Sequence, residues 1–282
     1  MKHLVIIPAY NEEEIISNVI DSLINQSQPP ETLIIVDDGS TDKTASIVTE
    51  YTSKYPWIKL VQNHKKDPRA TGSKIVKAFM LGLSSAVLEN YDLVSKFDAD
   101  LSFPEDYLET INSKFADSKL GLAGGSCVIE SNGDWILEKV AKGDHIRGAL
   151  KTYRAEAYKE IGGIPAFMGW DSADEFLLRY YGWEIMLVSD LNVKHFRETN
   201  ELNGWKKTAK LNAQVYHNLR YGFLIGSFSS LKRCFNSNPK IINGILTFFN
   251  FLWMFTQENS TQVSKEVGKF IRSYRWKTIL KS

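Results

Sequence analysis

Cysteine is scarce in this chain, and the shortage excludes two kinds of architecture. The 282 residues include 2 cysteines, Cys127 and Cys234, which stand far apart. Disulfide frameworks and cysteine-rich metal sites both need several cysteines at characteristic spacings. We therefore expect both thiols to be free and buried.

We also expect neither a targeting signal nor a membrane-spanning apolar run. The chain opens with one lysine and the short apolar run 4–7, which has neither the length nor the cleavage site of a signal peptide. Residues 241–255 are strongly apolar, but Asn243 and Asn250 interrupt them, and they fall short of the roughly 20 residues that a membrane-spanning helix needs. We expect a cytoplasmic protein without a transmembrane helix.

The net charge is only +1, but it is distributed unevenly. Positions 201–282 hold 13 Lys and Arg against 3 Asp and Glu, which leaves 21 against 30 in positions 1–200. Hydrophobic residues at 43% and charged residues at 24% are ordinary for a folded globular protein. We expect residues 1–200 to form one domain and residues 201–282 to form a basic, aromatic-rich and mainly helical extension.

Apolar runs of strand length alternate with amphipathic stretches in the first 100 residues. The runs are residues 4–7, 32–36, 58–61 and 91–97, and a helical pattern follows each of the first three. We expect Asn11 to cap the first of these helices. Runs that are apolar throughout are typical of strands buried on both faces, so the pattern predicts an open α/β sheet with right-handed crossovers.

The pattern is less regular further along the chain. We expect a helix at residues 105–116, a strand at 120–129, and a small-residue cluster at 145–154 that leads into a helix ending near Ile161. Another strand is expected at residues 185–188.

Three polar loops follow strands of the predicted sheet, at residues 8–12, 37–40 and 98–100. In open α/β sheets, ligands bind beyond the carboxyl ends of the strands, where these loops converge. Asp98 and Asp100 are two residues apart, so an extended backbone points both carboxylates to the same side. Paired carboxylates favour a divalent cation, although Asp-x-Asp alone is also found in solvated loops.

The three loops together resemble the family 2 glycosyltransferases, which use nucleotide-diphospho-sugars and have the GT-A fold. The similar segments are residues 7–12 (Ile-Pro-Ala-Tyr-Asn-Glu), 36–42 (Val-Asp-Asp-Gly-Ser-Thr-Asp) and 98–100 (Asp-Ala-Asp), and the resemblance covers roughly residues 1–200. It implies a Rossmann-like mixed sheet flanked by helices. It also implies a Mn²⁺- or Mg²⁺-dependent hexosyltransferase that moves a sugar to an acceptor hydroxyl with inversion, in cell-surface glycan or polysaccharide synthesis.

The resemblance also implies roles for individual residues. Those implied to bind the nucleotide-sugar are Pro8, Ala9, Tyr10, Glu12, Asp37, Asp38, Arg69, Gly72, Lys74, Asp98, Ala99, Arg147 and Trp170. Either Asp38 or Asp37 would contact the base, and Arg69, Gly72 and Lys74 match the family only loosely.

The implied metal ligands are Asp98, Asp100 and His195. A lone histidine is more often structural, but His195 stands where the family has a histidine that reaches the metal, and neutral imidazole suits Mn²⁺. Arg197 would then contact the diphosphate.

Three carboxylates within five residues, Asp171, Asp174 and Glu175, lie beside Trp170 and exceed what a helix start requires. Inverting transfer needs one carboxylate to accept the proton of the attacking hydroxyl. The family pattern is Glu-Asp followed by an arginine, whereas this chain has Asp174 before Glu175 and a shorter interval to Arg179. We expect Asp174 to be the base, with Glu175 second and Asp171 third.

The basic extension has two interpretations. Its cationic residues alternate with tryptophan, tyrosine and phenylalanine, which fits peripheral contact with an anionic membrane. Alternatively, its helices pack on the catalytic domain with the charges in water. The residues concerned are Lys206, Lys207, Lys210, Lys232, Arg233, Arg272, Arg275 and Lys277. No nucleic-acid recognition motif is present.

Other functions fit parts of the sequence. Residues 97–102 also resemble the nucleophile motif of haloacid dehalogenase phosphatases, but that family carries the motif on its first strand. A sugar-1-phosphate nucleotidyltransferase should open with a glycine-rich loop, which residues 8–11 are not. A non-catalytic nucleotide-sugar-binding protein would keep the donor site without needing the acidic cluster.

Overall fold

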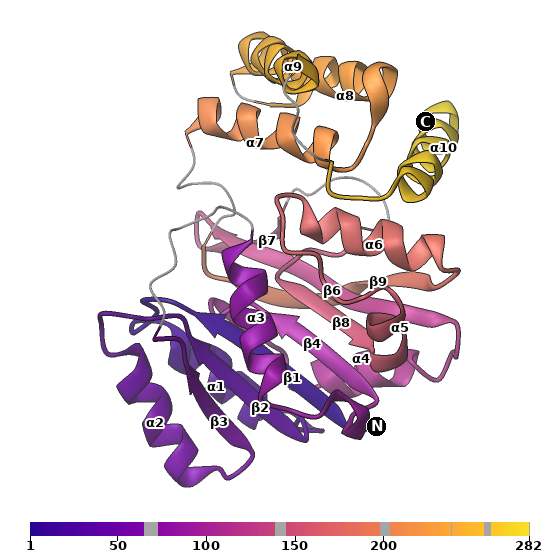
Figure 1. Ribbon diagram of the computed structural model, residues 1–282. Helices are drawn as coiled ribbons and strands as arrows, with labels where there is room; N and C mark the ends of the chain where they lie inside the picture. Colours follow the sequence, from indigo (N-terminus) through magenta and orange to yellow (C-terminus); the bar gives the residue numbers. More distant parts are fainter. Residues whose placement is uncertain (65–72, 139–144, 198–203, 238, 257–260, 282) are drawn as a thin grey trace. The chain divides into compact units, whose positions relative to one another are not determined.

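The computed structural model describes residues 1–64, 73–138, 145–197, 204–237, 239–256 and 261–281 (Figure 1). The chain divides into two compact units. Unit 1 comprises Met1–Ala166 and Tyr181–Arg197, and unit 2 comprises Phe167–Tyr180 and Glu198–Ser282.

Unit 1 is built on one mixed sheet with the strand order β3-β2-β1-β4-β8-β6-β9-β5, and β7 pairs with β6. The strands are β1 (His3–Ala9), β2 (Thr32–Asp37), β3 (Ile58–Gln62), β4 (Leu93–Phe97), β5 (Leu101–Ser102), β6 (Leu120–Ser131), β7 (Asp134–Leu137), β8 (Leu150–Arg154) and β9 (Glu184–His195). Strands β1 to β4 are mutually parallel, as the apolar runs predict. The predicted α/β sheet is therefore confirmed.

The helices of unit 1 cover both faces of this sheet (Figure 1). They are α1 (Ile16–Ile24), α2 (Thr44–Lys54), α3 (Lys74–Ser84), the short 3₁₀ turn η1 (Leu88–Asn90), α4 (Tyr107–Lys114) and α5 (Ala155–Glu160). Apolar side chains of α1 and α4 join Val5 and Ile7 in one continuous core. On the opposite face α3 approaches closely, because a Cβ at Gly82 would lie 2.6 Å from Val36 and 2.7 Å from Ile6.

One local prediction for unit 1 was wrong, and one strand was missed. Asn11 is not a helix cap, since α1 begins at Ile16 and Asn11 adopts a left-handed φ of 55°. Its side chain instead accepts a hydrogen bond from the backbone of Thr41, which ties the first loop to the second. The helix predicted to end near Ile161 is present as α5, but the sequence missed that residues 150–154 before it form strand β8, inserted antiparallel between β4 and β6.

Unit 2 consists of helices within its described residues. They are α6 (Trp170–Tyr180), α7 (Trp205–Asn218), α8 (Gly222–Asn236), α9 (Lys240–Thr256) and α10 (Lys265–Lys281). Ala173 and Phe176 of α6 are buried in one cluster with Leu219, Tyr221 and residues of α10. Contact therefore groups the acidic helix α6 with the C-terminal helices, whereas the sequence prediction assigned it to a domain ending at residue 200.

Three of the arginines that the sequence analysis assigned to a basic surface have internal partners instead. Arg233 donates to Asn212 at 2.7 Å and to Ser237 at 3.0 Å. Arg272 donates to the backbone carbonyl of Arg220, and Arg275 donates to the hydroxyl of Tyr221. Among the described residues, no helix is long and apolar enough to cross a bilayer.

Candidate functional site

The loop after β1 and the loop after β2 border one cavity of about 260 Å³. The cavity is lined by Pro8, Ala9, Tyr10, Glu12, Asp38, Lys74, Ile75 and Ala78. Six of these residues are among those predicted to bind the donor. The structure thus brings the first two motifs together at the carboxyl ends of adjacent parallel strands, where ligands bind in open sheets.

Asp38 rather than Asp37 faces this cavity. The Asp38 carboxylate lies 3.1 Å from the Lys74 ammonium and accepts a hydrogen bond of 2.7 Å from Asn63. The Lys74 ammonium also lies 4.8 Å from the centre of the Tyr10 ring. Asp37 is buried, and its carboxylate closes a turn by accepting from the backbone N–H of Ser40. Of the two aspartates considered for the contact with the base, Asp38 is the one that lines the cavity, and its contact with the base stays a prediction.

The carboxylate of Asp98 has a buried lysine as its partner. Lys96 is 1% exposed, and its ammonium donates to Asp98 and, at 3.0 Å, to the backbone carbonyl of Gly148. Lys96 and Asp98 are two residues apart at the end of β4, so both point to the same side. A fixed positive charge therefore stands against the first aspartate of the Asp-Ala-Asp motif.

Asp100 faces His195 because of strand pairing. Leu101 of β5 pairs antiparallel with His195 of β9, and Phe196 donates its N–H to the backbone carbonyl of Asp100. As a result, Asp100 Oδ2 lies 3.5 Å from His195 Nε2. Two predicted metal ligands, 95 positions apart in the chain, meet at one point.

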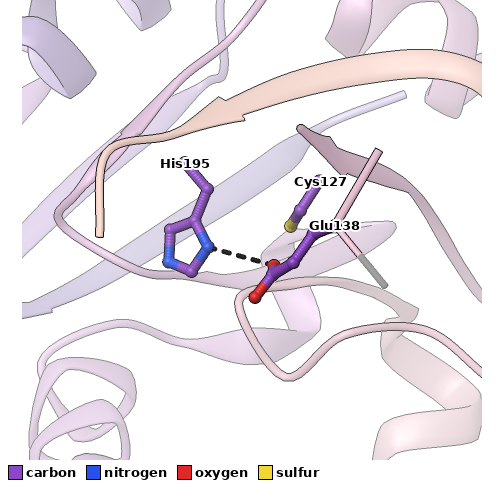
Figure 2. A group of neighbouring side chains, drawn as sticks. All are labelled: Cys127, Glu138 and His195. Carbon is purple, nitrogen blue, oxygen red and sulfur yellow. Dashed lines mark hydrogen bonds and ion pairs between the residues drawn. The ribbon is translucent and has the colours of Figure 1, made fainter. Parts of the chain in front are cut away.

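Behind His195 lies a buried cluster that the sequence did not predict (Figure 2). Glu138 Oε2 is 3.3 Å from His195 Nδ1, and Arg147 Nη2 is 2.7 Å from Glu138 Oε1. Cys127 completes the group, with ligand atoms of Cys127, Glu138 and His195 all within 4.8 Å of one another. Arg147, predicted to bind the donor, is thus engaged by Glu138.

Strand geometry explains why these residues meet. Glu138 donates its N–H to the carbonyl of Cys127, which extends the β6–β7 ladder by one bond. Cys127 pairs with Val193 in the parallel β6–β9 pair, so His195, two residues later, is on the same face. No spacing in the sequence indicates Glu138. Strand β7 is short, and Cys127, the backbone partner of Glu138, lies 11 positions earlier in the chain.

Burial and charge shift the titration of this cluster in opposite directions. Burial lowers the pKa of His195, but hydrogen bonds and charges from Asp100 and Glu138 outweigh this effect and raise the pKa to about 9. Burial raises the pKa of Cys127 to about 12, so this thiol is neutral at physiological pH. Without a metal, His195 is therefore the cation between two carboxylates.

The donor set fits a divalent metal such as Mn²⁺. Asp100 offers carboxylate oxygen and His195 offers imidazole nitrogen, a combination that suits Mn²⁺. When Nδ1 of His195 donates to Glu138, Nε2 presents its lone pair on the side of Asp100. A carboxylate behind the ligating histidine is the usual arrangement in metal sites, where it fixes the tautomer.

A second ion pair joins the first loop to the end of β9. Arg197 Nη1 donates to Glu12 Oε1 at 2.9 Å. Burial raises the pKa of Glu12, Arg197 opposes this effect, and the negative charges of Asp100 and Asp98 add to it. Glu12, which lines the cavity, is therefore close enough to interact electrostatically with both aspartates of the motif.

The predicted catalytic acids lie in unit 2, on helix α6. Asp174 is 0% exposed and Glu175 is 5% exposed, whereas Asp171 is half-buried near the start of the helix. Asp174 accepts a hydrogen bond of 2.7 Å from the N–H of Glu175, and Arg179 lies 3.4 Å from Glu175 Oε2. Two adjacent buried carboxylates exceed what helix packing needs.

The remaining predicted residues are placed as follows. Ala99 is buried between the two aspartates, and Trp170 is buried at the first position of α6. Arg69 and Gly72 lie outside the described residues. Lys96 could have been found from the sequence, since it precedes Asp98 by two positions within a strand.

Comparison with known proteins identifies the fold and the family. A family model described as glycosyl transferase family 2 matches residues 4–172. The chain is 31% identical over 188 residues to the β-monoglucosyldiacylglycerol synthase of Synechocystis, covering 65% of this chain and 37% of that protein. It spans less than half the length of the curated relatives it matches.

Two solved structures are similar along most of the chain. The structure of S. aureus TarS 1–349 is 21% identical with a TM-score of 0.57, and the match covers 94% of this chain and 76% of that one. The mannosyltransferase PcManGT of Pyrobaculum calidifontis, in complex with GDP-Man and Mn²⁺, is 16% identical with a TM-score of 0.56, covering 99% and 80%. These likenesses show the GT-A fold, whose transferases commonly use a divalent metal.

The haloacid dehalogenase alternative is thereby excluded, because the family match covers the aspartate motif and the two loops before it. The family match, over residues 4–172, extends over more than half of the chain. This chain belongs to glycosyl transferase family 2.

Proposed function

We propose that the protein is an inverting, metal-dependent hexosyltransferase that moves a sugar from a nucleotide-diphosphate donor to an acceptor hydroxyl. One observation carries this proposal. The cavity bordered by Tyr10, Asp38 and Lys74 shares Glu12 with the carboxylate cluster of Asp98 and Asp100. A mostly apolar pocket with a few polar groups, and with a metal-compatible acidic cluster at its border, suits a nucleoside attached to a diphosphate.

The residues of unit 1 bind and orient the donor in this proposal. Tyr10 offers an aromatic face and Asp38 a hydrogen-bond acceptor for a nucleoside base. Lys74 and Arg197 contact the pocket residues Asp38 and Glu12, and they would balance the charge of the diphosphate. Pro8 and Ala9 supply the wall of the cavity.

Asp100 and His195 would hold Mn²⁺ or Mg²⁺, with Asp98 beside them. Such an ion, when bound, neutralises the charge that develops on the departing nucleoside diphosphate. Glu138 and Arg147 keep His195 oriented through the hydrogen bond to Nδ1. We regard Glu138 as a positioning residue and Arg147 as its support, in place of the direct donor contact predicted for Arg147.

Asp174 would accept the proton of the acceptor hydroxyl as that oxygen attacks the anomeric carbon. Glu175 and Asp171 remain the second and third choices. Removing the base should lower turnover by about 10²–10⁴-fold while leaving donor affinity in place.

The acceptor in this proposal is the hydroxyl of a glycan or a lipid-linked molecule, at the cytoplasmic side of a membrane. The similarity to a diacylglycerol glycolipid synthase supports this class of acceptor. Specificity for one nucleotide and one sugar depends on pocket shape, so it is a question for ligand screening.

A thermal-shift panel of UDP-, GDP- and dTDP-sugars, with and without Mn²⁺, tests the donor site. One nucleotide class should raise the melting temperature in a metal-dependent manner, because a ligand that binds only the folded state stabilises it. The shift should vanish in Asp100→Ala. A panel without any metal-dependent shift would contradict the proposal.

The same panel separates an enzyme from a non-catalytic binding protein. Asp174→Asn and Glu175→Gln should keep the thermal shift, and at least one of them should lose release of nucleoside diphosphate. If neither variant changes release of the nucleotide, then the acidic helix is not catalytic and a binding function is favoured.

A further inference from the structure

Helices α8 and α9 expose large apolar side chains to solvent. Within the described residues, 11 of the 22 exposed large hydrophobic side chains are on these two helices. They are Phe223, Leu224, Phe228, Leu231 and Phe235 on α8, and Ile241, Ile242, Ile245, Phe249, Trp253 and Phe255 on α9. We call these residues the apolar face. Two helices of 15 and 17 residues thus hold half of such side chains.

Most of the apolar face forms one stripe on each helix. On α8 the positions 224, 228, 231 and 235 recur at intervals of four, three and four, which places them on one side of the helix. On α9 the positions 242, 245, 249 and 253 recur at intervals of three, four and four, which also places them on one side of the helix. Such stripes normally face a partner.

These side chains cannot turn inward, because the inner sides of both helices are already filled. A Cβ at Gly226 of α8 would lie 2.0 Å from Phe251 of α9, and one at Gly244 of α9 would lie 2.2 Å from Cys234 of α8. Ser230, between these contacts, is fully buried. The apolar face is therefore the surplus that remains after the helices have packed.

The exposed area is large for a surface without a partner. Phe235 is 78% exposed, Leu224 67%, Ile241 65% and Phe249 61%. The five phenylalanines of the apolar face alone expose on the order of 500 Å², given about 150–250 Å² for an aromatic side chain. The whole face therefore exceeds the roughly 300–600 Å² of the largest patch on a typical monomer.

Charge around the apolar face is of one sign. Residues 202–257 contain no Asp or Glu, whereas they contain seven Lys and Arg. Lys232 and Lys240 are exposed; Lys232 stands three positions before Phe235 on α8, and Lys240 immediately precedes Ile241 on α9. A second copy of this surface would bring the same positive charge against it, which opposes self-association. An anionic partner is favoured.

We propose that α8 and α9 dock this protein on the surface of an anionic lipid bilayer. The apolar face enters the boundary between headgroups and acyl chains, and Lys232 and Lys240 contact lipid phosphates. Trp253 has the amphipathic ring that prefers this boundary. The helices lie on the bilayer, because neither is long enough to span it. Docking on lipid does not depend on the proposed function. The inference that the acceptor is membrane-borne, however, rests on the proposed function.

Co-sedimentation of the full chain with vesicles tests this surface. The vesicles are phosphatidylcholine alone or phosphatidylcholine mixed with phosphatidylglycerol, and no metal or donor is added. The protein should sediment with the anionic vesicles. The double variant Phe235→Ser/Phe249→Ser should bind them at least about tenfold more weakly, because both rings leave the hydrocarbon boundary.

Charge reversal separates the two contributions. Lys232→Glu/Lys240→Glu should weaken binding to anionic vesicles by roughly tenfold or more, since each lysine near such a surface contributes about fivefold. Matched controls in unit 1 are Val87→Ser, at an exposed apolar position, and Lys54→Glu, at an exposed lysine. Both controls should bind like the unaltered chain.

Two results would overturn the proposal. In the first, the unaltered chain stays in the supernatant with both kinds of vesicle. In the second, light scattering finds a lipid-free dimer that the double variant converts to a monomer, which would make the apolar face an interface between copies. Donor-induced thermal shifts of the double variant should equal those of the unaltered chain, so failure of docking is distinguished from failure of the transferase site.

Discussion

The two units of this protein depart from the usual arrangement of side chains in opposite ways. Unit 1 places charged groups inside: Lys96 and Glu138 are buried, and each has an oppositely charged partner. Helices α8 and α9 of unit 2 place phenylalanine and isoleucine outside. Buried charges and exposed apolar side chains both lower the stability of a folded protein. Residues of either kind therefore indicate a role other than folding.

The difference assigns separate tasks to the two units. Charges inside unit 1 are arranged around the Asp100–His195 pair, which suits a metal and a diphosphate. The apolar side chains of unit 2 suit a surface without directional bonds, such as lipid. Changes in the metal-binding residues of unit 1 should therefore leave lipid binding intact, and changes in the apolar face of α8 and α9 should leave donor binding intact.

The largest effect is expected from Asp100→Ala. Loss of this carboxylate removes a ligand of the proposed metal, which contributes several kcal/mol to catalysis, so turnover should fall roughly a thousandfold. Nucleoside diphosphate release and calorimetric titration with Mn²⁺ measure the two consequences. Asp134→Ala, at an exposed aspartate of β7, is the matched control. Unchanged Mn²⁺ affinity in Asp100→Ala would contradict the site, and loss of vesicle binding would break the separation of tasks.

Acid should destabilise unit 1 through His3. This histidine is buried against Ser95 and Asn112, and burial lowers its pKa from 6.5 to about 4. Because the unfolded chain takes up the proton first, stability is complete above pH 6.5 and is lost as the pH falls towards 4. The loss is on the order of 3 kcal/mol at most.

Urea unfolding at several pH values measures this effect. His3→Gln should be less stable at neutral pH but should show a flatter decline towards pH 4. His217→Gln, in helix α7, is the control, and its pH profile should follow that of the unaltered chain. Parallel profiles for His3→Gln and the unaltered chain would show that His3 does not titrate as its burial requires.

A smaller effect is expected from Glu138→Gln, which tests the support of the metal ligand. The neutral side chain no longer holds the Nδ1 proton of His195 firmly, so Mn²⁺ affinity should fall about 10–100-fold. Electron paramagnetic resonance of free Mn²⁺ measures binding without relying on activity. Glu130→Gln, an exposed position of β6, should bind Mn²⁺ normally. Equal affinities for the two variants would reduce Glu138 to a structural role.

The smallest effect is expected from Gly226→Ala in unit 2. The added methyl group would meet the ring of Phe251, so the free energy of unfolding should fall by about 1–3 kcal/mol. Gly204→Ala is the control, because no atom of the described residues lies within 4 Å of its Cβ position. Thermal unfolding measures the difference, and the donor-induced shift should persist in both variants. A full loss of donor binding in Gly226→Ala would mean that the units are coupled.

Much of unit 1 could be predicted from the sequence. Strands β1 to β4 are buried on both faces, so their apolar runs and intervening helical stripes predict the parallel half of the sheet. Loops that follow parallel strands must meet at one edge, which is why Tyr10 and Asp38 could be placed in one cavity. Strand periodicity could also have placed Lys96 beside Asp98.

Other features depend on contacts that no local pattern encodes. Strand β8 enters the sheet antiparallel, and its short segment resembles a loop. Glu138 reaches His195 only through the pairing of β6 with both β7 and β9. The buried side of helix α9 carries Asn243 and Thr247, whereas its exposed side carries Ile245 and Phe249. Hydropathy alone therefore does not tell which side faces the neighbouring helices and which faces solvent. Likewise, α6 groups with the C-terminal helices because Phe176 and Tyr221, which are far apart in the sequence, are buried in one cluster.

The ion pair between Lys96 and Asp98 has a thermodynamic consequence. Since Lys96 already compensates Asp98, the chain alone offers a cation little net negative charge, and Asp100 shares its own with His195. An incoming pyrophosphate would supply the missing oxygen ligands, as Mg²⁺-type sites generally require. Metal and nucleotide should then bind synergistically, each raising the affinity of the other by the same factor.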